Sequence, residues 1–175
     1  MEHEHLIELI RTIPDFPKPG IFYRDITTLL KDKDGLRLAV DAMAKSFKSV
    51  EIDVVAGVEA RGFILGAPIA IALDCGFVPV RKEGKLPGDV ISENYQLEYG
   101  EATIEVHRDA VSKTDRVLVI DDVLATGGTM EATCGLLENI GATISGICIL
   151  VELSILAGRR RLEPHRIESI IRYND

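Results

Sequence analysis

Short runs of apolar residues alternate along the chain with segments in which apolar residues recur at helical spacing. The apolar runs predict buried strands at 53–58, 77–80, 117–120, 143–150 and 167–173. Apolar runs of this length are typical of strands that are covered on both faces of a parallel sheet. Because strands and helices alternate, the pattern predicts an α/β fold with an open, mainly parallel twisted sheet flanked by helices.

Helical spacing of apolar residues predicts four helices. They are expected over 6–13, 34–47, 63–73 and 129–140. Asp34 is the expected N-cap of the second helix, and Gly141 is expected to follow the last turn of the fourth. Pro68 is compatible with the third helix if it stands in the first turn. Ser154 is expected to cap a short helix that runs into the basic residues 159–161.

Two segments have no regular period. Three prolines within 14–19 predict an extended, turning segment. Residues 81–94 contain two glycines, a proline and several charged side chains, which predicts a long polar loop, and such loops are usually functional or disordered. Alternating apolar and polar residues over 102–106 then predict a half-exposed strand. Because the chain has no internal repeat and no evident linker, a single domain over 1–175 is expected.

Composition narrows the possible functions. The chain has 175 residues and a mass of 19.2 kDa, which is the size of one domain. Its 20 Lys and Arg residues against 28 Asp and Glu residues give a net charge of -8, which argues against a nucleic-acid-binding protein. No apolar run approaches the roughly 20 residues of a membrane span, and the polar start of the chain does not resemble a secretory signal. Three widely spaced cysteines without a C-x-x-C motif favour a cytoplasmic protein with no cysteine metal site.

The strongest chemical signal follows the apolar run at 117–120. Two acids come first, and a small-residue segment then leads into the next predicted helix. In open α/β sheets ligands bind at the carboxyl ends of the strands. Glycines allow close approach of the backbone, and the amides at a helix start bind phosphate. The residues expected to bind a phosphate group are Ala125, Thr126, Gly127, Gly128 and Thr129.

The two acids before this loop, Asp121 and Asp122, suit another part of the ligand. A phosphate repels carboxylates, whereas two vicinal hydroxyls donate hydrogen bonds to them. The segment therefore predicts a ribose 5-phosphate site with the diol at the acids. Neither the Gly-Lys-Ser/Thr of a Walker loop nor the G-x-G-x-x-G dinucleotide fingerprint is present. The alternative is a glycine-rich turn beside a solvated acid pair.

A second candidate anion site follows the apolar run at 53–58. Glu59, Ala60, Arg61 and Gly62 lead from this run into a predicted helix, so that another helix start faces the same edge of the sheet. An arginine can donate two parallel hydrogen bonds to a phosphate. The alternative for Arg61 is a surface ion pair with Glu59.

Together these segments resemble the type I phosphoribosyltransferases. The segment from Asp121 to Thr129 is similar to the phosphoribosyl pyrophosphate motif of that family. Four further blocks are similar to the members that act on adenine, and the five blocks stand in the same order along nearly the whole chain. They lie at 14–26, 59–63, 81–87 and 97–100. Glu83 departs from the pattern, because many relatives have proline there.

The resemblance implies a reaction and a set of site residues. The expected reaction is adenine plus phosphoribosyl pyrophosphate giving AMP plus pyrophosphate. The loop at 59–61, with a cis peptide bond near 59–60, and Lys82 and Lys85 would bind the pyrophosphate. Phe22 would pack on the adenine ring, and Arg24 would offer backbone hydrogen bonds from a base-binding segment at 1–33.

The resemblance also implies a catalytic carboxyl, a metal and a partner. Glu98 would transfer a proton at the purine when the flexible loop at 81–100 closes. Pyrophosphate needs Mg²⁺, which would be bound chiefly through substrate oxygens rather than by a dedicated set of protein ligands. A homodimer is expected, and the resemblance leaves open whether Lys82 completes the site of its own subunit or that of the neighbour.

Two alternatives stay open at this point. The first is a phosphoribosyltransferase for hypoxanthine, guanine, xanthine or orotate, with the same ribose phosphate loop and a different base segment. The second is a regulator that binds phosphoribosyl pyrophosphate without turnover. Such a regulator usually carries an added nucleic-acid-binding element, which neither the length nor the charge of this chain favours.

Overall fold

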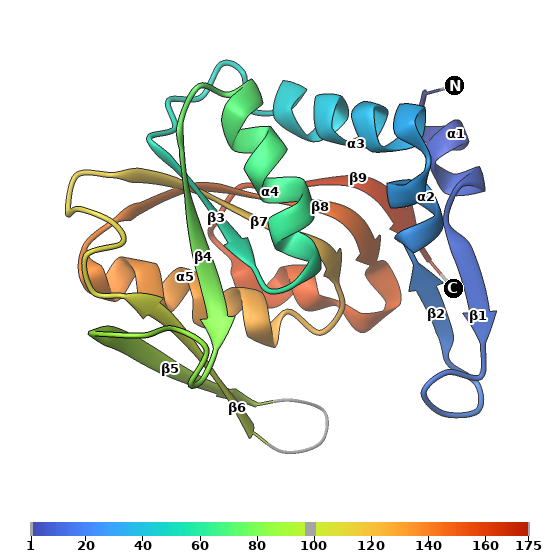
Figure 1. The fold of residues 1–175 in the computed structure, drawn as a ribbon. Helices are drawn as coiled ribbons and strands as arrows, with labels where there is room; N and C mark the ends of the chain where they lie inside the picture. The colour runs from blue at the N-terminus through green and yellow to red at the C-terminus, as the bar shows by residue number, and fades with distance from the viewer. Residues whose placement is uncertain (1, 97–100, 175) are drawn as a thin grey trace.

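A seven-stranded sheet runs through the centre of the molecule in the computed structural model, which describes residues 2–96 and 101–174 (Figure 1). Its strands are β3 (Val54–Val58), β4 (Gly76–Lys82), β5 (Val90–Gln96), β6 (Glu101–His107), β7 (Arg116–Leu124), β8 (Thr143–Leu153) and β9 (Ile167–Tyr173). The spatial order is β5-β6-β4-β3-β7-β8-β9. The five strands from β4 to β9 in that order are parallel, and β5 and β6 form an antiparallel edge. The expected open, mainly parallel α/β sheet is confirmed.

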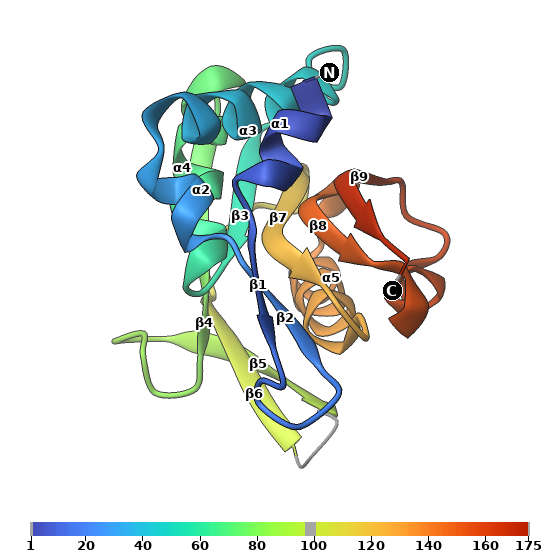
Figure 2. The same cartoon turned by 90° about the vertical axis from the view of Figure 1, so that its right-hand side faces the viewer.

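Helices cover both faces of this sheet (Figure 2). They are α1 (Glu2–Glu8), α2 (Thr27–Lys31), α3 (Lys33–Lys45), α4 (Arg61–Ala72), α5 (Gly128–Ile140) and the 3₁₀ turns η1 (Ser154–Leu156) and η2 (Gly158–Leu162). The first four lie on one face, and α5 lies on the other. None of the helices in the described ranges combines the length and the apolar character that a membrane crossing requires.

The two faces of the sheet bury two separate cores. Along β7, Leu118 and Ile120 belong to the core under α1 to α4, whereas Val117 and Val119 pack with Leu137 of α5. Successive side chains of a strand point to opposite faces, so a strand that is apolar at every position must be covered on both sides. This two-sided burial explains why the sequence is apolar at every position from 117 to 120.

Two antiparallel hairpins extend from the carboxyl end of the parallel strands, on opposite sides of it (Figure 1). One consists of β1 (Arg11–Pro14) and β2 (Phe22–Asp25), and the other of β5 and β6. The expected polar loop over 81–94 is wrong at both ends, because Arg81 and Lys82 belong to β4 and, from Val90 onward, β5 pairs with β6 along its whole length. Among the described side chains of β5, Ile91 and Tyr95 pack against the α5 core, and polar residues stand between them, so the apolar signal of this edge strand is weak.

Three helix predictions need correction. The helix expected over 6–13 ends at Glu8, because Ile13 precedes a proline and pairs with Tyr23 in the β1–β2 hairpin. The N-cap of α3 is Asp32, whose carboxylate accepts hydrogen bonds from the amides two and three residues on, and not Asp34. Pro68 stands inside α4 rather than in its first turn.

Of two predictions about the last third of the chain, one agrees with the structure and one does not. Gly141 follows α5 with φ 106°, in the left-handed region that glycine adopts without strain, as expected. The helix expected after Ser154 is instead a pair of 3₁₀ turns, and no side chain caps either of them. Ala157 joins the two turns with φ 53° and thereby interrupts a continuous helix.

Gly146 and Gly135 are expected to respond to alanine in opposite directions. A methyl group at Gly146 of β8 would overlap the ring of Phe47, whereas one at Gly135 of α5 meets no other part of the chain within 4 Å. Gly146→Ala should destabilise the protein by about 1–3 kcal/mol through overpacking. Gly135→Ala should stabilise it by roughly 1 kcal/mol through better helix propensity. Urea denaturation of both variants measures this, and equal midpoints would contradict the packing described.

Candidate active site

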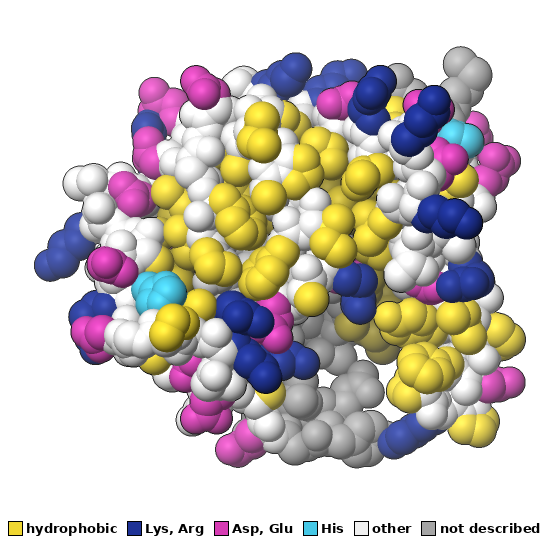
Figure 3. Space-filling model, viewed as in Figure 1, with side chains coloured by type: hydrophobic (Ala, Val, Ile, Leu, Met, Phe, Trp, Pro, Cys, Tyr) yellow, Lys and Arg dark blue, Asp and Glu magenta, His cyan; other side chains and the backbone are white. Residues whose placement is uncertain are grey.

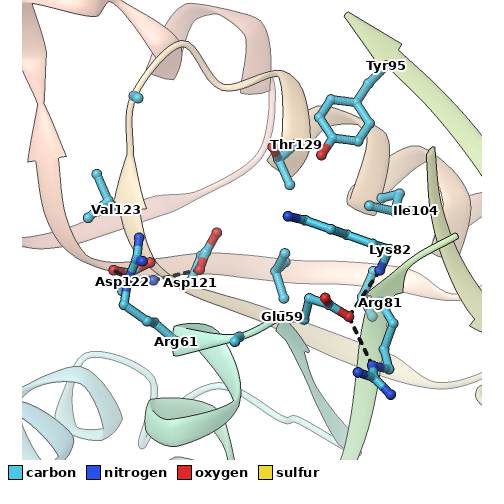
Figure 4. A pocket seen from close by; sticks show the side chains of 14 residues that line it. Glu59, Arg61, Arg81, Lys82, Tyr95, Ile104, Asp121, Asp122, Val123 and Thr129 are labelled. Carbon is cyan, nitrogen blue, oxygen red and sulfur yellow. Dashed lines mark hydrogen bonds and ion pairs between the residues drawn. The ribbon is translucent and has the colours of Figure 1, made fainter. Parts of the chain in front are cut away.

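A cavity of about 510 Å³ opens at the carboxyl ends of β3, β4 and β7 (Figure 4). Its wall is built from the β3–α4 junction, the end of β4, the β5–β6 hairpin and the end of β7 with the loop that follows. The lining residues are Val58, Glu59, Ala60, Arg61, Val80, Arg81, Lys82, Tyr95, Ile104, Asp121, Asp122, Val123, Ala125 and Thr129. The structure thus brings together most of the residues that the sequence predicted to bind a phosphoribosyl group and a pyrophosphate.

The loop between β7 and α5 offers open backbone donors. Gly127 is the N-cap of α5 with φ 86°, and it has no side chain with which to cap the first turn. Uncapped amides at the positive end of a helix bind anions. A second cavity of about 80 Å³ lies against this loop and is lined by Thr126, Gly127, Gly128 and Thr129 among others. The geometry suits one phosphate group.

The two acids have different surroundings. Both lie within β7 rather than after it, because the strand continues to Leu124. Asp122 is only 4% exposed, and its carboxylate forms an ion pair with the guanidinium of Arg61. Asp121 lines the cavity and accepts a hydrogen bond of 2.8 Å from the amide of Asp122. Burial, together with the charge of Asp122, raises the pKa of Asp121 well above its ordinary value. The two carboxylates are therefore not equivalent, because that of Asp122 is engaged by Arg61 whereas that of Asp121 faces the cavity.

The start of α4 meets the end of β7 at close range. The peptide bond between Glu59 and Ala60 is cis, as the resemblance implied. Ala60 is the N-cap of α4 and provides no side-chain cap, so a second set of helix amides is open at the cavity. A methyl group at Gly62 would lie 3.0 Å from the carbonyl oxygen of Ile120 and 3.1 Å from Oδ1 of Asp121. A glycine at this position therefore allows the two helix starts to share one cavity.

The charged side chains of the cavity form two separate contacts (Figure 4). Glu59 accepts hydrogen bonds from Nε of Arg81 at 2.9 Å and from the amide of Lys82 at 3.2 Å. Arg61 pairs with Asp122. The alternative that Arg61 pairs with Glu59 is therefore wrong, because Arg81 occupies that carboxylate.

The two lysines of the predicted site lie in different places. The side chain of Lys82 extends from the end of β4 across the cavity, toward the side where Thr129 lies (Figure 4). Lys85 is exposed and does not line the cavity, and its carbonyl accepts a hydrogen bond of 3.0 Å from Arg81. A pyrophosphate contact by Lys85 stays a prediction.

The predicted base-binding residues lie on β2. Neither Phe22 nor Arg24 lines the cavity, and Phe22 is 52% exposed. The guanidinium of Arg24 lies 3.9 Å from the ring centroid of Tyr173 and donates a 2.6 Å hydrogen bond to the hydroxyl of Thr12. The side chain of Arg24 is thus engaged with other parts of the protein, so a contact to a base would come from its backbone.

Some site residues could not be found from the sequence, and one lies beyond the structure. Arg81 was visible only as a neighbour of Lys82, and nothing marked Tyr95, because the strand that carries it has little apolar signal. Gly158 touches the phosphate loop from a segment with no recognisable motif. Glu98, the predicted catalytic carboxyl, lies outside the described residues.

Comparisons with known proteins agree with this geometry. The family model of the phosphoribosyl transferase domain matches residues 25–172. The chain is 55% identical to the adenine phosphoribosyltransferase of Desulfitobacterium hafniense over 164 residues, which cover 94% of this chain and 95% of the relative.

Solved structures extend the likeness to three dimensions. The adenine phosphoribosyltransferase of Thermoanaerobacter pseudethanolicus superposes with a TM-score of 0.95 at 46% identity, covering 98% of this chain and 99% of that one. The enzyme from Giardia lamblia, complexed with 9-deazaadenine, gives a TM-score of 0.94 at 40% identity, covering 100% of this chain and 99% of that one. With its two helix starts at one cavity and this likeness over nearly its whole length, the chain belongs to the adenine phosphoribosyltransferases, a family within the phosphoribosyl transferases.

Proposed function

We propose that the protein is a purine salvage enzyme that transfers the 5-phosphoribosyl group from phosphoribosyl pyrophosphate to adenine, giving AMP and pyrophosphate. The observation that carries this proposal is the meeting of two uncapped helix starts, those of α4 and α5, at one cavity. Phosphoribosyl pyrophosphate has a phosphate at each end of its ribose, so it needs two anion sites one sugar apart. Independent support comes from the curated relatives. Two of them are 55% and 50% identical to this chain, and both are named for this activity.

Each end of the substrate has its own set of residues in this proposal. The amides and hydroxyls from Thr126 to Thr129 bind the 5-phosphate, and Asp121 accepts a hydrogen bond from a ribose hydroxyl. The α4 start binds the pyrophosphate, with Arg61 and Lys82 as the cations. Departure of pyrophosphate leaves positive charge on the ribose, and the fixed cations stabilise the negative charge that develops on the leaving group.

Adenine enters from the side of the β1–β2 hairpin in this proposal. Phe22 provides an exposed aromatic face for the purine, and the backbone of Arg24 provides hydrogen bonds to its edge. The Saccharomyces cerevisiae relative is known as a complex with adenine, and the Giardia lamblia relative as a complex with 9-deazaadenine, which supports a base site in this fold. A base with a 6-oxo group exchanges donor and acceptor positions and leaves buried groups unpaired.

Mg²⁺ fits this site as a partner of the substrate. Among the described residues, no cluster of three or more His, Cys, Asp or Glu side chains could hold a metal ion by itself. The acid pair of β7 nevertheless places oxygen donors in the cavity, and Mg²⁺ prefers oxygen ligands and keeps part of its water shell. Mg²⁺ would be held chiefly by the pyrophosphate and ribose hydroxyl oxygens of the substrate, where it would neutralise charge on the pyrophosphate.

A homodimer is part of the proposal, and the outer face of α4 supports it. Figure 3 shows a broad hydrophobic surface over this helix. From Gly62 to Leu73 the sequence has no charged or polar side chain, and Ile71 is 81% exposed. Exposed apolar surfaces of this kind mark protein interfaces. A second copy is the occupant that the family resemblance implies, and it would lie beside Arg61 at the start of the same helix.

A cytoplasmic location also belongs to the proposal. The three cysteines are unpaired, and two of them are buried. Unpaired cysteines are usual in the reducing compartments of the cell.

The test of the function is a panel of bases. With phosphoribosyl pyrophosphate and Mg²⁺, adenine should release pyrophosphate, and hypoxanthine, guanine, xanthine and orotate should be poor substrates. Removal of Mg²⁺ by EDTA should abolish the release. Comparable kcat/KM for adenine and hypoxanthine would overturn adenine as the substrate, and binding of phosphoribosyl pyrophosphate without turnover on any base would identify a regulator.

Glu98 is proposed to exchange a proton with the purine. Loss of the carboxyl should lower kcat by about 10²–10⁴, the usual range for a general acid–base group. Gln keeps the side-chain length but cannot exchange a proton, so Glu98→Gln should lose nearly as much activity as Glu98→Ala. Single-turnover rates measure the chemical step. A near-normal rate for Glu98→Gln would leave an orienting role only, and a near-normal rate for Glu98→Ala would remove Glu98 from the site.

A substitution that introduces a single charge tests the proposed interface on α4. Ile71→Asp should convert a dimer into a monomer of about 19.2 kDa in light scattering after size exclusion, because the carboxylate would be buried without a partner in the dimer. Ile7→Asp is the matched control, since Ile7 is also exposed, at 40%, but lies on α1. A monomeric wild type, or a dimeric Ile71→Asp, would contradict this interface.

A further inference from the structure

The proposed phosphate loop, residues 125–129 between β7 and α5, contacts a segment that is distant in sequence. A methyl group at Gly127 would lie 2.6 Å from the carbonyl oxygen of Gly158, and one at Gly158 would lie 2.8 Å from the amide nitrogen of Gly127 and would overlap the carbonyl of Ala125. The two backbones are therefore in direct contact, without room for a side chain on either. Gly158 is buried and begins η2, directly after the left-handed Ala157.

The residue after Gly158 ties this segment to the sheet. The guanidinium of Arg159 donates to both carboxylate oxygens of Glu152, at 3.0 and 2.6 Å. It also donates to the carbonyl of Ile167 and to the hydroxyl of Ser169, each at 3.0 Å. Because Glu152 stands near the end of β8, the ion pair closes the turn between this strand and η2. The position of Gly158 is thus determined from β8 and β9.

The carboxylate of Glu152 is fully engaged. It is 5% exposed, and it accepts a further hydrogen bond of 2.6 Å from Ser169 and lies 3.3 Å from Nε of Arg172. The hydrogen bond from Arg159 lowers the pKa of Glu152. Burial of the carboxyl opposes this effect but is the weaker of the two. A buried, bidentate and charge-assisted contact of this kind has one well-defined geometry. It can therefore hold a backbone in place more firmly than an exposed ion pair can.

We infer that Glu152 and Arg159 are positioning residues for the phosphoribosyl site. They hold Gly158 against Gly127 and thereby fix the loop in the conformation in which its amides face the 5-phosphate. Neither side chain lines the cavity. The inference rests on the proposed function, because it concerns the same loop, and it assigns part of the affinity for phosphoribosyl pyrophosphate to an ion pair outside the site.

The inference predicts a selective loss of affinity. Glu152→Gln and Arg159→Met should each raise the KM for phosphoribosyl pyrophosphate about tenfold or more, comparable with the loss of a charged hydrogen bond. The KM for adenine should change by less than about twofold, because the base contacts come from β2. Arg159→Lys keeps the charge without the planar fork and should give an intermediate KM. Thr129→Ala, which removes a hydroxyl of the loop itself, is the positive control.

The matched control is Glu168→Gln. Glu168 of β9 pairs at 2.9 Å with Arg166, which directly precedes that strand, and none of the described contacts of this pair reaches Gly158 or the loop. The control should keep the wild-type KM for both substrates. Assays at 25 °C are run on variants whose thermal melting shows them to be folded at that temperature.

A second measurement does not depend on turnover. In protein labelled with ¹⁵N-glycine, the amide resonances of Gly127 and Gly128 should shift in Glu152→Gln and Arg159→Met, and they should stay in place in Glu168→Gln. Gly158→Ala should shift the same resonances, because it displaces the loop while leaving the ion pair intact.

The outcomes separate the two proposals. If the wild type has no activity with adenine, the proposed function fails, and the resonances still decide the positioning role. If the wild type is active and both variants match Glu168→Gln in KM and in resonances, the positioning role is overturned. Failure of Glu152→Gln and Arg159→Lys to fold would also overturn it, because the ion pair would then belong to the stability of the sheet as a whole.

Discussion

The parallel pairing of β3 with β7 is the constraint on which the site depends. In this register Gly57 lies opposite Ile120, so the two strands end side by side and the helices that follow them begin at the same edge. Gly62 then allows the first turn of α4 to approach the end of β7. The dipoles of both helices point their positive ends at one cavity, so the backbone amides of two helix starts are available to anions there, beside the side chains of Arg61 and Lys82.

Charge balance in the cavity follows from this geometry. In a protein with a net charge of -8, an anion site needs local cations. Arg61 is held by Asp122 and Arg81 by Glu59, so each of these guanidinium groups has a carboxylate partner. In the proposed function a bound pyrophosphate would share or replace these carboxylates, because phosphate oxygens are also strong acceptors for arginine. The acids near the phosphate site thus also serve to place the arginines.

The two ends of the phosphate loop are supported in different ways. On one side it continues from β7, the strand at the centre of the parallel region, whose position is determined by two cores. On the other side it meets the backbone of Gly158, whose own position depends on the ion pair of Arg159 with Glu152. A small-residue loop has no side chains with which to pack, so its shape is imposed by what surrounds it.

The sequence by itself determined the fold class and the position of the loop proposed to bind phosphate. Strands covered on both faces leave uninterrupted apolar runs, and a phosphate loop uses consecutive residues, so both signals are local in the chain. Tertiary structure decided the rest. Strand β5 was missed because an edge strand is stabilised by its pairing with β6 rather than by its own apolar residues.

The ion-pair partners of charged side chains likewise could not be predicted from the sequence. Arg61 stands two positions from Glu59 and sixty-one from Asp122, and it pairs with Asp122 because β3 and β7 are neighbours in the sheet. Gly158 is an ordinary glycine in the sequence and becomes part of the site only because β8 and β9 bring it to Gly127. Local composition thus reports which groups a site contains, and the order of the strands decides which of these groups meet.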